Sequence, residues 1–76
     1  MDIKKTLDAR GLLCPMPVVK TKKAIMEIEI GEILEMLATD KGSIPDMEAW
    51  ARQTGHELLQ SEDRGETFRF LIKRTH

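Results

Sequence analysis

Two prolines, Pro15 and Pro17, follow the only cysteine of the chain, Cys14, and they restrict what the backbone can do there. Proline has a fixed φ and no backbone N–H, so a helix tolerates it in the first turn and is disrupted by it further along. The sequence therefore predicts that a helix begins at these prolines. Cys14 would stand at the start of that helix, near unpaired N–H groups and the positive end of the helix dipole, which both favour a thiolate.

The spacing of apolar residues predicts an alternation of strands and helices along the rest of the chain. Strands are expected at residues 3–8, 32–39, 56–62 and 66–74, and helices at residues 15–28 and 45–54. Ser43 is the candidate cap of the second helix, with Asp46 three residues further on. Gly55 suits the left-handed residue that ends this helix.

These elements predict one fold class. A strand, a helix and a second strand in this length form a right-handed crossover with parallel strands, and a short turn at residues 63–65 makes the last two strands an antiparallel hairpin. The expected fold is an α/β two-layer sandwich of order βαβαββ, with a four-stranded mixed sheet and both helices on one face. The second strand is apolar on both sides, which favours an interior position. Residues 1–76 are expected to form a single domain, too small for a large enclosed active site.

Charge and composition exclude several functional classes. Twelve basic and 13 acidic residues leave a net charge of −1, which argues against direct binding of nucleic acid. The sequence shows neither an apolar run long enough to span a bilayer nor a signal peptide, so no membrane association and a cytoplasmic location are expected. A lone cysteine forms no internal disulfide, which suits a reducing compartment. We expect a monomer when the chain is free.

The absence of other reactive groups narrows the chemistry of Cys14. A dithiol redox site needs a second cysteine, which the chain lacks. A thiolate metal site needs several ligands, whereas the chain offers one Cys and two His. A papain-like nucleophile needs a His base oriented by a third group, and the sequence indicates none. Neither a metal nor a cofactor is therefore expected. Two readings remain: a small core residue without reactivity, and a thiol whose sulfur carries something between partners.

The loops after parallel strands lie at the carboxyl edge of a sheet, where open α/β proteins commonly place their chemistry. Cys14 and the turn at Asp40 are expected to share this edge. Arg10 and Lys41 are candidates to stabilise a thiolate there. Asp8 and Arg10 are expected either to orient the Cys14 loop or to pair with each other.

One stretch resembles the Cys-Pro-x-Pro signature of the TusA/SirA family of sulfur carrier proteins, namely Leu7-Asp8-Ala9-Arg10-Gly11-Leu12-Leu13-Cys14-Pro15-Met16-Pro17-Val18. The resemblance covers nearly the whole chain, through Gly31, Asp40, residues 46–50 and Gly55-His56-Glu57-Leu58. It implies a βαβαββ fold like that of the C-terminal domain of translation initiation factor 3. One departure is Lys41, since many relatives have proline after the acidic residue of this turn.

The resemblance also implies a function. Cys14 would accept sulfane sulfur as a persulfide from a cysteine desulfurase or a rhodanese-like protein and relay it to an acceptor protein, as in transfer-RNA thiolation, molybdenum-cofactor biosynthesis or sulfur oxidation. Pro15 and Pro17 would shape the helix start, with Asp8, Arg10 and Asp40 in support. Such a chain is a sulfurtransferase-like carrier rather than a stand-alone turnover enzyme. The alternatives are a regulatory or RNA- or protein-binding module that does not use the thiol, and a relative that handles selenium.

Overall fold

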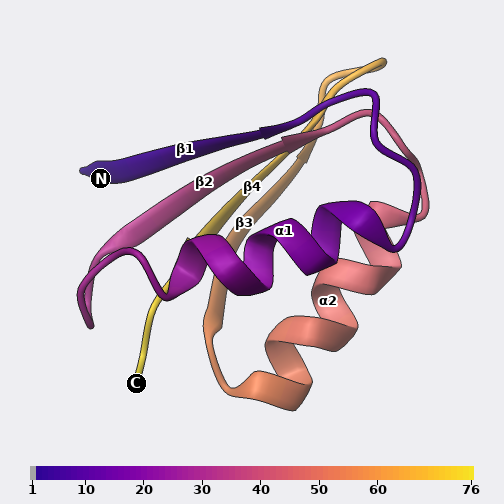
Figure 1. The fold of residues 1–76 in the computed structure, drawn as a ribbon. Helices are drawn as coiled ribbons and strands as arrows, with labels where there is room; N and C mark the ends of the chain where they lie inside the picture. The colour runs from indigo at the N-terminus through magenta and orange to yellow at the C-terminus, as the bar shows by residue number, and fades with distance from the viewer. Residues whose placement is uncertain (1) are drawn as a thin grey trace.

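The computed structural model describes residues 2–76 and contains the six elements in the predicted order (Figure 1). They are β1 (Ile3–Ala9), α1 (Met16–Ile25), β2 (Ile33–Ala38), α2 (Ser43–Thr54), β3 (Glu57–Asp63) and β4 (Phe68–Lys73). The largest difference from the predicted bounds is the end of α1, at Ile25 instead of residue 28. The N–H groups of Met26 and Glu27 bond three residues back rather than four, so the chain leaves the helix in a tighter turn, and Ile28 is still buried.

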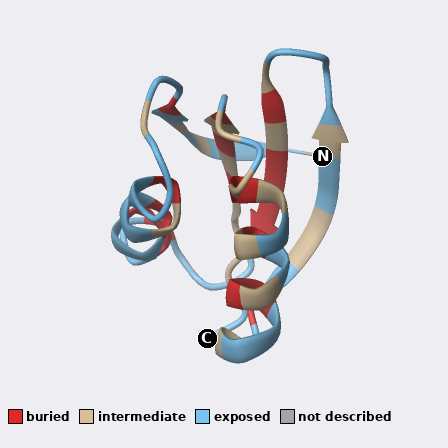
Figure 2. Cartoon of the chain, turned by 90° about the vertical axis from the view of Figure 1, so that its right-hand side faces the viewer, coloured by how far each residue is buried: buried red, intermediate tan, exposed pale blue. Residues whose placement is uncertain are grey.

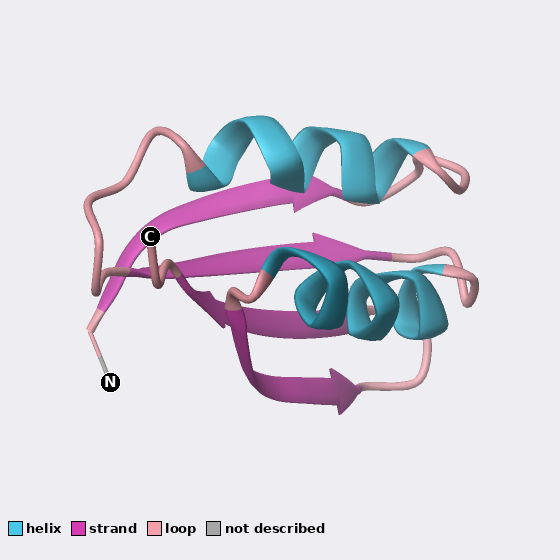
Figure 3. Cartoon of the chain, turned by 90° about the horizontal axis from the view of Figure 1, so that it is seen from below, coloured by secondary structure: helices cyan, strands magenta, loops and turns pink. Residues whose placement is uncertain are grey.

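The strands form one mixed sheet in the order β1-β2-β4-β3. β1 and β2 are parallel, whereas β4 is antiparallel to both of its neighbours. β2 is therefore an interior strand, as its apolar character on both faces predicted. Both helices cover the same face of the sheet and begin at the end where β1 and β2 finish (Figures 1 and 3). The predicted two-layer α/β sandwich is confirmed.

The core lies between the sheet and the two helices. Its buried side chains alternate along the two central strands, because every second residue of a strand faces the helices. The main contributors are Leu34, Met36 and Ala38 of β2, Phe68, Phe70 and Ile72 of β4, and Ala24, Ile25, Met47, Trp50 and Ala51 of the helices. β3 and β4 form a hairpin, and Figure 2 shows that β4 is largely buried whereas β3 is mostly exposed or half-buried.

At the two ends of α2, the expected N-cap is wrong and the expected C-terminal glycine is confirmed. The N-cap is Gly42, not Ser43, and the Ser43 hydroxyl donates a hydrogen bond of 2.6 Å to the carbonyl oxygen of Asp40. Ser43 already lies inside the helix, so its side chain cannot accept from the first N–H groups in the way a cap does. Gly55 has the predicted left-handed conformation, with φ 85°, and its N–H donates to the carbonyl oxygen of Ala51.

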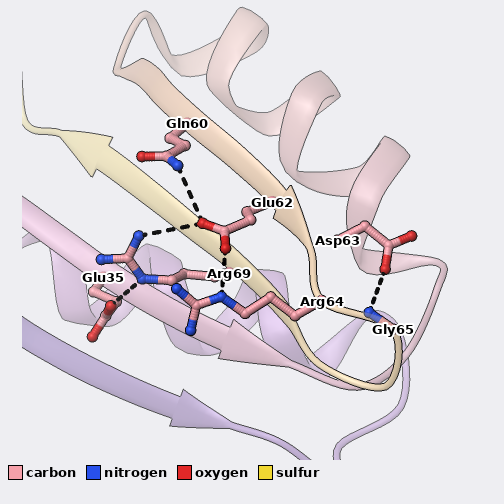
Figure 4. Close-up of polar contacts among 7 residues, drawn as sticks. All are labelled: Glu35, Gln60, Glu62, Asp63, Arg64, Gly65 and Arg69. Atoms are coloured by element: carbon pink, nitrogen blue, oxygen red, sulfur yellow. Dashed lines mark hydrogen bonds and ion pairs between the residues drawn. The ribbon is translucent and has the colours of Figure 1, made fainter.

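The opposite face of the sheet carries a polar network instead of a helix (Figure 4). Arg69 Nε donates to Glu35 Oε2 at 2.5 Å, and Arg69 Nη1 lies 3.6 Å from Glu62 Oε2. Arg64 also donates to Glu62. Leu71 lies two residues after Arg69 on β4 and therefore on the same helix-free face, where it is only 3 % exposed because the neighbouring side chains of the sheet shield it.

Candidate functional site

Cys14 lies in the loop between β1 and α1, at the carboxyl edge of the two parallel strands. Its backbone N–H donates a hydrogen bond of 2.6 Å to Asp40 Oδ2, in the loop that follows β2. The other oxygen of the same carboxylate accepts from the N–H of Gly42 at 3.0 Å. The two loops therefore meet as the parallel pairing predicted, and Asp40 is the side chain that joins them.

The Cys14 thiol is exposed and donates a hydrogen bond to Oδ2 of Asp46, in the first turn of α2. The sulfur lies in a depression of about 340 Å³ between the two helices, lined by Pro15 and Val18 on one side and by Asp46 and Gln53 on the other. From the sequence, Asp46 was named only as a capping partner and as part of the family resemblance, and its contact with the thiol was not predicted. One signal for this contact was available in the sequence: Asp46 lies in the first turn of a helix that begins at the carboxyl edge of the sheet, which is also the edge expected for Cys14.

Gly42 lies next to the Cys14 side chain. A Cβ atom at this position would lie 3.4 Å from the Cys14 Cβ and 3.8 Å from the Cys14 Sγ. Gly42 has an ordinary right-handed conformation, with φ −61°, so it is not there to permit an unusual backbone. A Cβ atom there would only come into van der Waals contact with Cys14, so the distances show that the start of α2 lies directly beside the cysteine side chain.

The environment of the thiol opposes its ionisation. The hydrogen bond to Asp46, partial desolvation and the negative charges of Asp46 and Asp40 all raise the pKa of Cys14. The prediction that the helix start favours a thiolate was therefore wrong. Pro15 and Pro17 carry no N–H, and the N–H of Met16 donates to the carbonyl oxygen of Leu13, so residues 15–17 offer no free backbone donor to the sulfur.

Arg10 binds Asp8 rather than the sulfur. Its guanidinium donates to both carboxylate oxygens, at 2.8 and 3.0 Å, and its backbone N–H donates to the same side chain. These bonds lower the pKa of Asp8 to about 2. The N–H of Gly11 next donates to the Thr39 hydroxyl at 2.9 Å, a second tie between the two loops. Asp8 and Arg10 thus pair with each other, which was one of the two expectations.

The two prolines lie at the start of α1, as predicted. Pro15 is the N-cap and Pro17 is the second residue of the helix, so the helix begins one residue later than expected. Their carbonyl oxygens are used: that of Pro15 accepts from the Val19 N–H, and that of Pro17 accepts from the buried hydroxyl of Thr21. The two prolines therefore begin the helix, and their carbonyl oxygens still accept hydrogen bonds within it.

Two further properties of residues 2–76 bear on the site. Within this range no three or more His, Cys, Asp and Glu side chains gather where they could hold a metal ion. Neither of the two helices there combines the length and apolar character needed to cross a membrane.

Comparison with known proteins identifies a family for the chain. Residues 5–74 match the sequence profile of the family described as Sulfurtransferase TusA. The chain is 45 % identical to the sulfur carrier protein TusA of Allochromatium vinosum, with 97 % of each chain covered. It is 53 % identical to the YrkI protein of Bacillus subtilis over 92 % of this chain and 93 % of that one.

Two other relatives add information on length and fold. The chain is 56 % identical to YrkF of Bacillus subtilis over 90 % of its own length, but it spans only 37 % of that protein. The crystal structure of a SirA-like protein from Desulfitobacterium hafniense matches with a TM-score of 0.75 at 29 % identity, covering 95 % of this chain and 99 % of that one. The chain therefore belongs to the TusA family of sulfur carrier proteins.

Proposed function

We propose that Cys14 is the residue on which this chain carries sulfur, as a persulfide. The observation that carries the proposal is the placement of the single cysteine: its thiol is exposed at the carboxyl edge of the sheet, on a loop fastened by Asp40. An exposed thiol held on a rigid edge can be reached by another protein without opening the fold. Because the chain has no second cysteine, the sulfur cannot be lost to an internal disulfide.

The surface around the sulfur supports docking of partner proteins. Leu13 is 74 % exposed and Met16 is 41 % exposed, and the two flank Cys14 in sequence. Exposed apolar side chains next to a reacting group are typical of protein contact surfaces, and methionine adapts to several partners. We propose a cysteine desulfurase or a rhodanese-like protein as the donor and a protein of a sulfur-incorporating pathway as the acceptor. Transfer-RNA thiolation, molybdenum-cofactor biosynthesis and sulfur oxidation are such pathways.

The proposed role is that of a carrier in the cytoplasm, where a free thiol stays reduced. Cys14 reacts once with the donor and once with the acceptor, so the chain acts stoichiometrically within a relay. Asp8, Arg10, Asp40, Pro15 and Pro17 hold the loop and the helix start that present the sulfur. This assignment gives each of them a positioning role.

Intact mass measurement tests the proposal. After incubation with a cysteine desulfurase and cysteine, with a rhodanese and its sulfur donor, or with inorganic polysulfide, the chain should gain the mass of one sulfur atom. A reductant should remove it. The variant Cys14→Ser should gain nothing under the same conditions. If none of the three donors adds sulfur to the wild type, or if Cys14→Ser gains it equally, the proposal is wrong.

A further inference from the structure

Two carboxylates bind Cys14, and they do different things. Asp40 uses its oxygens for the backbone N–H groups of Cys14 and Gly42, which fixes the loop. Asp46 approaches from α2 and accepts the thiol hydrogen itself. One carboxylate thus holds the backbone of the cysteine, and the other holds the proton on its sulfur.

This arrangement is unusual for a nucleophilic cysteine. Reactive thiols generally lie next to cations or free helix N–H groups that stabilise the thiolate. Here the charged groups that act on the thiol are Asp46 and Asp40, and both disfavour a negative sulfur. Arg10, the cation nearest in sequence, is bound to Asp8. The resting site therefore favours an unreactive thiol over a reactive thiolate.

We propose that Asp46 is a positioning residue that keeps the empty Cys14 in its protonated form, turned against α2, so that stray electrophiles and oxidants react with it slowly. This inference deepens the proposed persulfide function and rests on it for its biological meaning. The hydrogen bond itself is a property of the unloaded chain, and it is present whatever the cargo is.

Loading must break this contact. In transfer from a persulfide donor, the Cys14 proton moves to the Asp46 carboxylate and on to water, and a sulfur lone pair forms a new S–S bond to the outer sulfur of the donor. The S–S bond of the donor breaks, and its electron pair leaves on the donor thiolate, which takes up a proton. The exchange is redox-neutral: one thiol and one persulfide become one persulfide and one thiol. The new persulfide has no hydrogen on Sγ to give to Asp46, so the contact is absent in the loaded state.

The consequence is that Cys14 discriminates between a docked donor protein and small reagents in solution. A small reagent in solution meets a thiol that is mostly protonated, and only the thiolate attacks. A docked donor protein can change the surroundings of Asp46 and so release the thiol. Asp46 thereby favours loading by a protein partner over uncontrolled reaction with free reagents.

The test is the pH dependence of alkylation of the unloaded full chain by iodoacetamide. The critical variant is Asp46→Asn, which keeps the size of the side chain and removes its charge. Glu48→Gln is the matched control, since Glu48 is an exposed residue of the same helix and removing its charge changes the net charge equally. Asp40→Asn is a second comparison. Circular dichroism of each variant checks that it is folded.

We expect the alkylation midpoint of Asp46→Asn to move to lower pH and its rate at neutral pH to rise several-fold, since more of the thiol is ionised. Glu48→Gln should match the wild type, and Asp40→Asn should change less than Asp46→Asn. A profile of Asp46→Asn that coincides with the wild type, or an equal change in Glu48→Gln, overturns the proposal.

A measurement on the wild type alone keeps the proposal testable if Asp46→Asn does not fold. The Cβ carbon of Cys14, followed by NMR, should titrate above the ordinary thiol value of about 8.5. A midpoint at or below that value overturns the role of Asp46. Neither readout uses sulfur transfer, whereas failure of the proposed persulfide function shows as the absence of a mass gain with every donor, so the two failures are distinguishable.

Discussion

The backbone N–H of Cys14 donates a hydrogen bond of 2.6 Å to Asp40 Oδ2, which fastens the sulfur-bearing loop after β1 to the loop after β2. Hydrogen bonds to an ionised acceptor are short and stronger than neutral ones. The Gly42 N–H binds the other oxygen of the same carboxylate, so the side chain is held on both sides. The position of the sulfur therefore depends on a residue 26 positions away in the sequence.

Replacement of Asp40 by alanine should loosen this loop. The Cys14 N–H loses its acceptor, so we expect its hydrogen exchange to accelerate and the urea midpoint of unfolding to fall. Asp40→Asn should show a smaller effect, because its amide oxygen can still accept one of the two bonds. Hydrogen exchange followed by NMR checks the first expectation and denaturation the second. Unchanged exchange at Cys14 in the alanine variant would contradict the role of Asp40.

Acid should weaken the contact between Asp8 and Arg10. The pKa of Asp8 falls from 3.8 to about 2, mainly because the Arg10 side chain donates to the carboxylate. The folded state thus binds fewer protons than the unfolded state in this interval, and the pair contributes stability above the ordinary pKa that is lost as pH falls toward 2. In Arg10→Met the pKa of Asp8 should return toward 3.8, which a carbon-detected NMR titration measures. An Asp8 midpoint that stays near 2 would show that another group lowers it.

The ion pair on the helix-free face should stabilise the fold. The side chains of Arg69 and Glu35 are each 16 % exposed, and Arg69→Met leaves the Glu35 carboxylate without its charged donor. We expect the free energy of unfolding to fall by about 1–2 kcal/mol. Lys20→Met removes the same charge from an exposed position of α1 and should change it by less than about 0.5 kcal/mol. Urea denaturation checks both values, and equal effects in the two variants would contradict the role of the pair.

Alanine substitutions at two leucines should distinguish an effect on stability from an effect on partner binding. Leu34 is fully buried in β2, and Leu34→Ala should lower the free energy of unfolding by about 2–5 kcal/mol. Leu13 is 74 % exposed beside Cys14, and Leu13→Ala should leave stability within about 0.5 kcal/mol while slowing sulfur loading by a donor protein. Denaturation and loading followed by mass spectrometry check the pair. Loading of Leu13→Ala at the wild-type rate would remove Leu13 from the docking surface.

Much of the fold could be predicted from the sequence because its causes are local. Pro15 and Pro17 tolerate only the first turn of a helix, and the helix begins there. Gly55 allows the left-handed conformation that ends α2. The alternation of Phe68, Phe70 and Ile72 along β4 places one face of the strand in the core. These effects act over a few residues, so composition and spacing carry them, and they determined the order of the elements.

The chemistry of the sulfur was decided only by the tertiary structure. Asp46 is 32 positions from Cys14, and the sequence places it near a helix start at the same edge of the sheet without showing that its carboxylate accepts the thiol hydrogen. The sequence suggested a helix start that favours a thiolate, whereas in the folded chain the hydrogen bond to Asp46 and the negative charges of Asp46 and Asp40 raise the pKa of the thiol. Electrostatic effects on an ionisable group depend on distances through space and on the direction of each hydrogen bond. The sequence by itself determined that Cys14 is the only thiol of the chain, and the packing of α2 against the Cys14 loop decided how readily that thiol ionises.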